Sequence, residues 1–216
     1  MNAHNTIITV GRRIGSGGKD IARMLATLFG AQLYDKELLN LAAQQSGFCK
    51  EFFERNDERT NFGRGWLHFD NPLMGGSFYG SMFSQEGLYE FQCEAIREAA
   101  RKGSCVFVGR TADYVLRDMP EATHVFVTAH GDDCLERVCQ RSGMEPRQAA
   151  KWIADEEQRR ASYYNYYTGK KWGHSESYDL CVNSSILGLE ATAQFIANFV
   201  RARGLKKENK RKNNLL

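Results

Sequence analysis

The sequence predicts an α/β fold, a three-layer sandwich in which helices cover both faces of a five-stranded parallel sheet. Five short apolar or β-branched segments alternate with segments whose apolar residues recur at helical spacing, and this alternation is typical of parallel sheets. The chain has 216 residues, of which 42% are hydrophobic, enough for one domain with a sizeable core. The predicted strands span residues 7–10, 31–34, 105–108, 124–128 and 178–182.

The predicted helices lie between these strands and have their own start or stop signals. The first runs from Lys19 to Phe29 and ends at Gly30, because glycine is favoured just past a helix end. A later helix is capped by Asp132 or Asp133, and the next one has Pro146 in its first turn. The remaining predictions are helices over residues 37–45, 87–102, 146–162 and 189–200, and an aromatic loop over 162–172.

Composition and charge narrow the classes of function. The net charge of +3 is too small to indicate a nucleic-acid partner. From residue 201 onward seven basic residues stand against one acid, and we expect a solvated, frayed terminus there rather than an RNA- or membrane-binding one. The six cysteines form no C-x-x-C pair, and no apolar stretch approaches the length of a membrane-spanning helix. We therefore expect a cytoplasmic protein with reduced thiols and no membrane partner.

The strongest functional signal follows the first predicted strand. Gly15, Ser16, Gly17, Gly18 and Lys19 form a glycine cluster that ends in a lysine and runs into a helix. Backbone N–H groups of such a turn converge on a phosphate, the helix N-terminus faces it, and the lysine adds a point charge. The alternative is a tight turn that needs glycines only for its geometry. A lysine at a helix start opposes the helix dipole, and a bound phosphate would offset that cost.

The cluster departs from the phosphate-binding consensus Gly-x-x-x-x-Gly-Lys-[Ser/Thr] at two positions. Counting back from Lys19 places Arg13 at the first glycine, and Asp20 stands where the consensus has a Mg²⁺-binding hydroxyl. The negative charge of Asp20 is favourable at a helix N-terminus, but it would repel a phosphate unless Mg²⁺ or Lys19 lies between them.

Polar residues at the carboxyl ends of two other strands are expected to meet Lys19, since parallel strands end at one edge of the sheet. Asp35 follows the second strand and either meets a substrate or metal or caps the next helix. Arg110 follows the third strand beside a glycine, and it suits recognition of a phosphate or carboxylate or a structural ion pair. Asp113 either pairs with Arg110 or contacts a ligand.

These motifs together resemble the cytidylate kinase-like branch of the P-loop nucleoside monophosphate kinases. The resemblance covers the chain to about residue 200. It is carried by Gly15–Ala22, by Tyr34–Leu38, by Gly109 and Arg110 with Asp113, and by Arg159 and Arg160. It implies a P-loop kinase domain over residues 1–203, with an acceptor-binding insert at about 47–85, a lid at about 137–175 and a basic, disordered tail over 204–216. Aromatic residues of the insert would stack on a base or form a small core of their own.

The resemblance implies transfer of the γ-phosphoryl group of ATP, with Mg²⁺, to a small acceptor such as CMP. By this analogy the catalytic residues are Lys19, Arg110, Arg159 and Arg160; ATP is held by Gly15, Ser16, Gly17, Gly18, Lys19, Asp20, Arg137 and Arg141; and Asp35, Arg110 and Asp113 serve the acceptor. The metal ligands, the acceptor and the oligomeric state stay open. Two alternatives remain, a non-catalytic nucleotide-binding protein with a degenerate loop and a nucleic-acid or partner-binding module using the basic tail and the aromatic insert.

Overall fold

The computed structural model describes residues 5–35 and 85–213 and confirms the α/β prediction. Five strands form one parallel sheet in the order β2-β3-β1-β4-β5. Their bounds are β1 Ile7–Arg12, β2 Gln32–Tyr34, β3 Cys105–Val108, β4 Ala122–Thr128 and β5 Leu180–Asn183. The predicted helix over 37–45 and nearly all of the insert over 47–85 lie outside the described residues.

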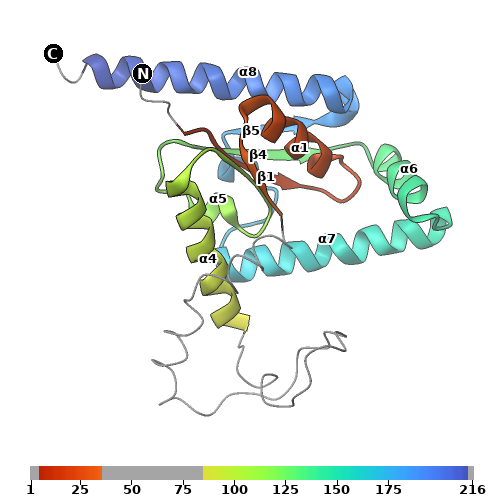
Figure 1. Ribbon diagram of the computed structural model, residues 1–216. Helices are drawn as coiled ribbons and strands as arrows, with labels where there is room; N and C mark the ends of the chain where they lie inside the picture. The colour runs from red at the N-terminus through yellow and green to blue at the C-terminus, as the bar shows by residue number, and fades with distance from the viewer. Residues whose placement is uncertain (1–4, 36–84, 214–216) are drawn as a thin grey trace, which may run out of the picture.

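The central strand β1 divides the core into two layers, because successive side chains of a strand point to opposite faces. Ile8 and Val10 pack with buried residues of helices α1 (Gly18–Phe29) and α8 (Ser184–Asn213). Ile7 packs on the other face, with residues of α4 (Gln85–Lys102) and α5 (Ala112–Val115). Figure 1 shows α1 and α8 on one side of the sheet and α4 on the other. The three layers therefore follow from the alternation of buried positions in the sheet.

The connection from β4 to β5 contains the remaining helices. These are α6 (Gly131–Ser142), the long α7 (Pro146–Thr168) and the short 3₁₀ helix η1 (Ser175–Ser177). Ile14, from the segment after β1, joins Val138 of α6 and Ala149 of α7 in a small separate core. This third cluster fixes the end of β1 against both helices. None of the helices in the described part of the chain is long and apolar enough to cross a membrane.

The aromatic loop predicted over 162–172 is wrong in its first half, because α7 continues to Thr168. Tertiary contacts of the tyrosines favour the helix. Tyr164 is buried with its hydroxyl group on Asp113, and the ring of Tyr167 stacks on Tyr89 with centroids 3.9 Å apart. The sequence analysis took the run of aromatic residues as the end of the helical pattern. In the structure their side chains contact other elements, and the helix continues through them.

Two other helix ends differ from the sequence prediction. α6 has His130 at its N-cap, and Asp132 and Asp133 lie in its first turn, where carboxylates interact favourably with the helix dipole. α8 begins at Ser184, kinks at Gly188 and extends to Asn213, so it enters the segment over 204–216 that the sequence analysis expects to be disordered. Because the kink at Gly188 interrupts the helical spacing near the start of α8, the sequence pattern does not reveal the first turn of this helix.

Candidate active site

The glycine-rich segment between β1 and α1 forms a tight loop whose glycines are required by close packing. Gly15 and Gly17 have φ angles of 74° and 73°, in the left-handed region that other residues rarely adopt. A Cβ on Gly15 would lie 2.6 Å from the Cα atom of Cys134, and one on Gly17 would collide with Leu189. The loop is thus held between α6 and α8, and its geometry depends on both helices.

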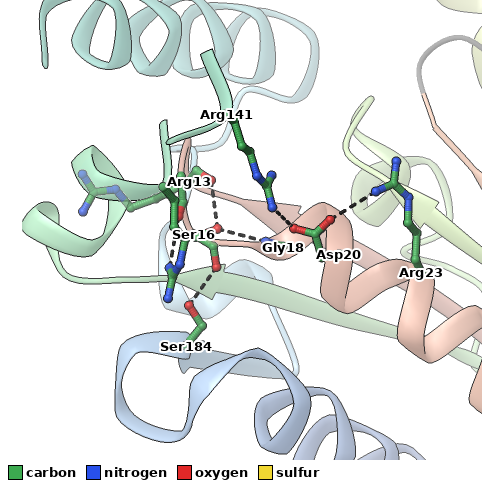
Figure 2. Close-up of polar contacts among 9 residues, drawn as sticks. Arg13, Ser16, Gly18, Asp20, Arg23, Arg141 and Ser184 are labelled. Carbon is green, nitrogen blue, oxygen red and sulfur yellow. Dashed lines mark hydrogen bonds and ion pairs between the residues drawn. The ribbon is translucent and has the colours of Figure 1, made fainter. Parts of the chain in front are cut away.

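The carbonyl oxygens of this loop accept hydrogen bonds from side chains of the protein. Ser184 Oγ donates to the carbonyl oxygen of Ser16 at 2.7 Å, and Ser16 Oγ donates to that of Arg13 at 2.9 Å, contacts that are drawn in Figure 2. Arg137 Nη1 donates to the carbonyl oxygen of Gly15 at 3.1 Å. Arg137 therefore supports the loop from α6, as a positioning contact on the predicted ATP site.

Half of the amide groups from Ile14 to Lys19 have no acceptor in the described part of the chain. The N–H groups of Gly15, Gly17 and Lys19 have no acceptor among residues 5–35 and 85–213. The other three amides have acceptors: that of Ile14 donates to Glu157 Oε1 of α7 at 2.5 Å, that of Ser16 to the Arg13 carbonyl oxygen and that of Gly18 to Ser16 Oγ, both at 3.4 Å. Open amides beside a helix N-terminus form a binding site for an anion such as phosphate.

The structure shows what offsets the negative charge of Asp20, which by itself would repel a phosphate. Its carboxylate lies between the guanidinium groups of Arg141, which comes from α6, and Arg23, whose Nη1 is 3.1 Å away (Figure 2). Two positive charges offset the negative charge that would repel a phosphate. Arg141 therefore acts on the loop through Asp20.

Lys19 and Asp35 come together as the sequence predicts. Lys19 Nζ lies 3.0 Å from Asp35 Oδ2, and 42% of the lysine side chain is exposed. Ion pairs with this degree of exposure contribute little stability. The ammonium can therefore exchange Asp35 for a phosphate at small cost.

A cavity of about 260 Å³ lies beside the loop, at the carboxyl ends of β1 and β3 and against α7. It contains Arg110, Asp113, Arg159 and Arg160, which the sequence placed in the site, together with Arg12, which it did not. The other lining residues are Gly11, Val108, Gly109, Thr111, Glu156, Tyr163, Tyr164, Trp172 and Tyr178. Lys19, Asp20, Asp35, Arg137 and Arg141 do not line it, so the predicted residues separate into a loop group and a cavity group.

Arg110 occupies a strained backbone position at the mouth of the cavity. Arg110 and Thr111 both have φ angles of 54°, immediately after Gly109 at 72°. Left-handed conformations cost a non-glycine residue about 1–2 kcal/mol and often occur at functional sites. The guanidinium group of Arg110 lies over the ring of Tyr163, with Cζ 5.4 Å from the ring centroid. The backbone therefore aims a cation into an aromatic-lined space.

Asp113 is buried and Arg160 is half-buried, and both have polar partners supplied by the protein. Asp113 is only 8% exposed, and the hydroxyl group of Tyr164 donates to its Oδ2 at 2.7 Å. Burial raises the pKa of the Asp113 carboxyl group. Arg160 Nη1 donates to the carbonyl oxygen of Arg12 at 3.0 Å, and burial lowers the pKa of Arg160. Arg159 instead forms an ion pair with Glu156 near the surface.

The sequence analysis missed Arg12, whose side chain runs from the loop to the cavity. A Cβ on Gly18 would lie 2.5 Å from Arg12 Cβ, and one on Gly109 would collide with the Arg12 guanidinium group. Glycines at both positions leave room for this side chain. The sequence does show an arginine at position 12 and glycines at positions 18 and 109. Only the fold, however, brings these three residues together.

Comparisons with known proteins agree with this architecture. A sequence model of the cytidylate kinase-like family matches residues 7–186. An uncharacterized protein from Eubacterium ventriosum is 26% identical, with a TM-score of 0.69 over 91% of this chain and 99% of the other. Shikimate kinase from Bacteroides thetaiotaomicron is 14% identical, with a TM-score of 0.50 over 91% of this chain and 98% of its own, a similarity of fold. No curated protein matches the chain.

Replacing Arg110 with glycine and with alanine will separate backbone strain from function. Glycine tolerates the left-handed φ angle and alanine does not, so we expect Arg110→Gly to be more stable than Arg110→Ala by about 1 kcal/mol. Urea denaturation of both variants measures this difference. Both variants lack the guanidinium group, so the effect of the missing charge is common to them. A glycine variant that is less stable than the alanine variant would contradict the strained geometry.

Asp113→Asn will test the protonation of the buried carboxyl group. Burial raises its folded-state pKa above the ordinary value of 3.8, so the contribution of this group to the stability of the wild type falls as pH rises from that value through the folded-state pKa. The neutral amide avoids this loss and still accepts the hydrogen bond from Tyr164. We expect the variant to gain stability relative to wild type as pH rises, measured by urea denaturation from about pH 3 to about pH 8. A difference that shrinks with rising pH would contradict this account.

Proposed function

Because the chain belongs to the cytidylate kinase-like family, we propose that it transfers the γ-phosphoryl group of ATP to a small anionic acceptor, with a nucleoside monophosphate such as CMP as the first candidate. One observation carries the proposal. The open amides of Gly15, Gly17 and Lys19 lie at the same sheet edge as a cavity lined by Arg12, Arg110, Arg159 and Arg160. We assign the donor anion to the loop and the acceptor anion to the cavity.

The loop group suits the triphosphate of ATP. Three N–H groups of the loop have no acceptor in the described part of the chain, and Lys19 adds a partly exposed ammonium group. Arg137 and Arg141 act on this group through Gly15 and Asp20 rather than by lining the cavity. A rigid set of donors at a helix N-terminus binds phosphate with little reorganisation.

The cavity group suits an acceptor that carries both a negative charge and a ring. Four arginines line the cavity together with the aromatic side chains of Tyr163, Tyr164, Trp172 and Tyr178. Guanidinium groups recognise phosphates and carboxylates with two parallel hydrogen bonds, and aromatic rings stack on planar groups. A nucleoside monophosphate has both features, and so in part do small cyclic carboxylic acids.

Phosphoryl transfer requires mainly that the reactants are positioned and their charge is neutralised, and it needs no covalent nucleophile from the protein. Arg12 runs between the loop and the cavity, and Arg159 and Arg160 reach the cavity from α7. One positive donor aimed at the charge that develops in the transition state can contribute roughly 3–4 kcal/mol. We assign this role to the cavity arginines.

A second candidate is nucleotide binding without turnover. The contact between Glu157 and the Ile14 amide favours it, because a protein carboxylate already occupies one of the loop donors. Lys19 is likewise paired with Asp35. Both contacts reduce the positive potential that the loop offers to ATP.

An ADP-release assay of the purified protein will distinguish the two candidates. ATP is supplied with each common nucleoside monophosphate, with small cyclic carboxylic acids and with dephospho-coenzyme A. We expect ADP release that depends on one acceptor, and CMP is the first to test. Stoichiometric ATP binding with no acceptor-dependent release would instead favour the non-catalytic candidate.

Gly17→Ala and Gly30→Ala form a matched pair for this assay. Both glycines have positive φ angles, 73° and 56°, but a Cβ would collide with another residue only at Gly17. We expect the change at Gly17 to lower ATP affinity by about tenfold or more, while the change at Gly30 preserves it. Isothermal titration calorimetry measures the affinity, and circular dichroism checks that both variants fold. Equal affinity in the two variants would count against the loop as the ATP site.

A further inference from the structure

The helix α4 carries a buried glutamine that faces the tyrosines of α7. Gln92 is only 2% exposed, and its Oε1 accepts a hydrogen bond from the hydroxyl group of Tyr163 at 3.3 Å. A buried amide side chain is costly unless it forms hydrogen bonds, because it gives up its contacts with water. Gln92 therefore makes a specific polar contact between α4 and α7, within an otherwise aromatic contact in which Tyr89 stacks on Tyr167.

Tyr163 connects this glutamine to Arg110. The guanidinium group of Arg110 lies over the Tyr163 ring, with Cζ 5.4 Å from the ring centroid. Burial raises the pKa of the Tyr163 hydroxyl group, and the positive charge of Arg110 acts in the opposite direction. Tyr163 therefore keeps its hydrogen at neutral pH and can donate it to Gln92.

The direction of that hydrogen bond decides what Tyr163 offers to Arg110. A tyrosine hydroxyl group has one hydrogen, and a guanidinium group can only donate. Because the hydrogen is directed at Gln92, the Tyr163 oxygen presents lone pairs to its other neighbours. These lone pairs and the face of the ring both attract a guanidinium group. An apolar residue at position 92 would allow the hydroxyl hydrogen to turn toward Arg110.

The same helix also contacts the strained turn that carries Arg110. Thr111 Oγ1 lies within hydrogen-bond distance of Tyr89 Oη, at 3.0 Å. Left-handed backbone at Arg110 and Thr111 persists only where the surrounding structure holds it in place. The helix α4 thus acts on Arg110 twice, through the backbone at Thr111 and through the side chain of Tyr163.

We propose that Gln92 is a positioning residue that holds the guanidinium group of Arg110 at the cavity through the hydroxyl group of Tyr163. This inference rests on the proposed function, in which Arg110 serves the acceptor. Gln92 does not line the cavity, so its effect on a ligand there passes through Tyr163 and Arg110. A cation that is already fixed loses little side-chain freedom when an anion binds. Removing the amide therefore weakens acceptor binding and spares the loop that we assign to ATP.

Kinetics of ADP release by the full chain, with CMP as the acceptor, test this inference. Gln92→Met removes the amide but keeps a long side chain, and Tyr163→Phe removes the hydroxyl group but keeps the ring. We expect each change to raise the KM for CMP about fivefold, the effect of one hydrogen bond. Calorimetry should find the ATP affinity of both variants within about twofold of the wild-type value. Because the two residues act in one chain of contacts, the double variant should raise the KM no further.

Tyr166→Phe is the matched control, because it removes a hydroxyl group from the same helix at a position that is 70% exposed. It should leave the KM for CMP unchanged, and circular dichroism checks that every variant folds. A wild-type KM in Gln92→Met would overturn the inference. Effects that multiply in the double variant, or an equal loss of ATP affinity, would also overturn it.

NMR of the Arg110 side chain tests the inference without turnover. The Nε–Hε signal of Arg110 is assigned by its loss in Arg110→Gly, and its heteronuclear NOE reports the order of the side chain. We expect a high NOE in wild type and in Tyr166→Phe, and a lower one in Gln92→Met and Tyr163→Phe. An equally high NOE in Gln92→Met would overturn the inference. If the wild type releases no ADP with CMP or any other acceptor, the proposed function fails, and this comparison decides the inference alone.

Discussion

The structure depends on the way in which side chains of three helices hold the backbone of the loop after β1. Arg137 of α6 and Ser184 of α8 donate to loop carbonyl oxygens, and Glu157 of α7 accepts from the amide of Ile14. These contacts satisfy the carbonyl groups, while three N–H groups find no acceptor in the described part of the chain. Donors fixed before the ligand arrives bind an anion with little reorganisation at that moment. The loop is therefore prepared by tertiary structure rather than by its own sequence alone.

The helix α7 connects this loop to the cavity beside it. Glu157 binds the backbone just after β1 and Arg160 binds the backbone at the end of β1. Arg160 also lines the cavity, together with Arg159, Tyr163 and Tyr164. A small movement of this one helix would alter both groups together, because it carries contacts to each of them. Arg12 provides a second connection, since its side chain lies between Gly18, at the start of α1, and Gly109, directly after β3. The proposed donor and acceptor sites thus share structural elements.

The sequence predicts those parts of this arrangement that depend on local pattern. Apolar runs define the strands, Gly30 ends α1 in the left-handed conformation, and the rule on strand ends brings Lys19 to Asp35 and places Arg110 at the cavity. These features follow from neighbouring residues or from one general property of parallel sheets. They can therefore be read without knowledge of long-range contacts.

The remaining features depend on contacts between distant residues, which no local pattern encodes. One of the two arginines that offset the charge of Asp20, Arg141, lies 121 positions away along the chain. The path of Arg12 depends on Gly109, and the helical end of α7 depends on rings and a carboxyl group from other elements. The sequence shows that Asp20 conflicts with a phosphate, but only the fold shows how the conflict is offset.

The most direct measurement is amide NMR of ¹⁵N-labelled protein titrated with ATP and, separately, with adenosine. The account predicts that ATP shifts the amide signals of Gly15, Gly17 and Lys19, while adenosine leaves them in place. The signal of Ile14, whose amide already donates to Glu157, serves as an internal comparison and should move least. Signals of these three amides that stay unchanged at saturating ATP would contradict the central claim that the loop binds the triphosphate.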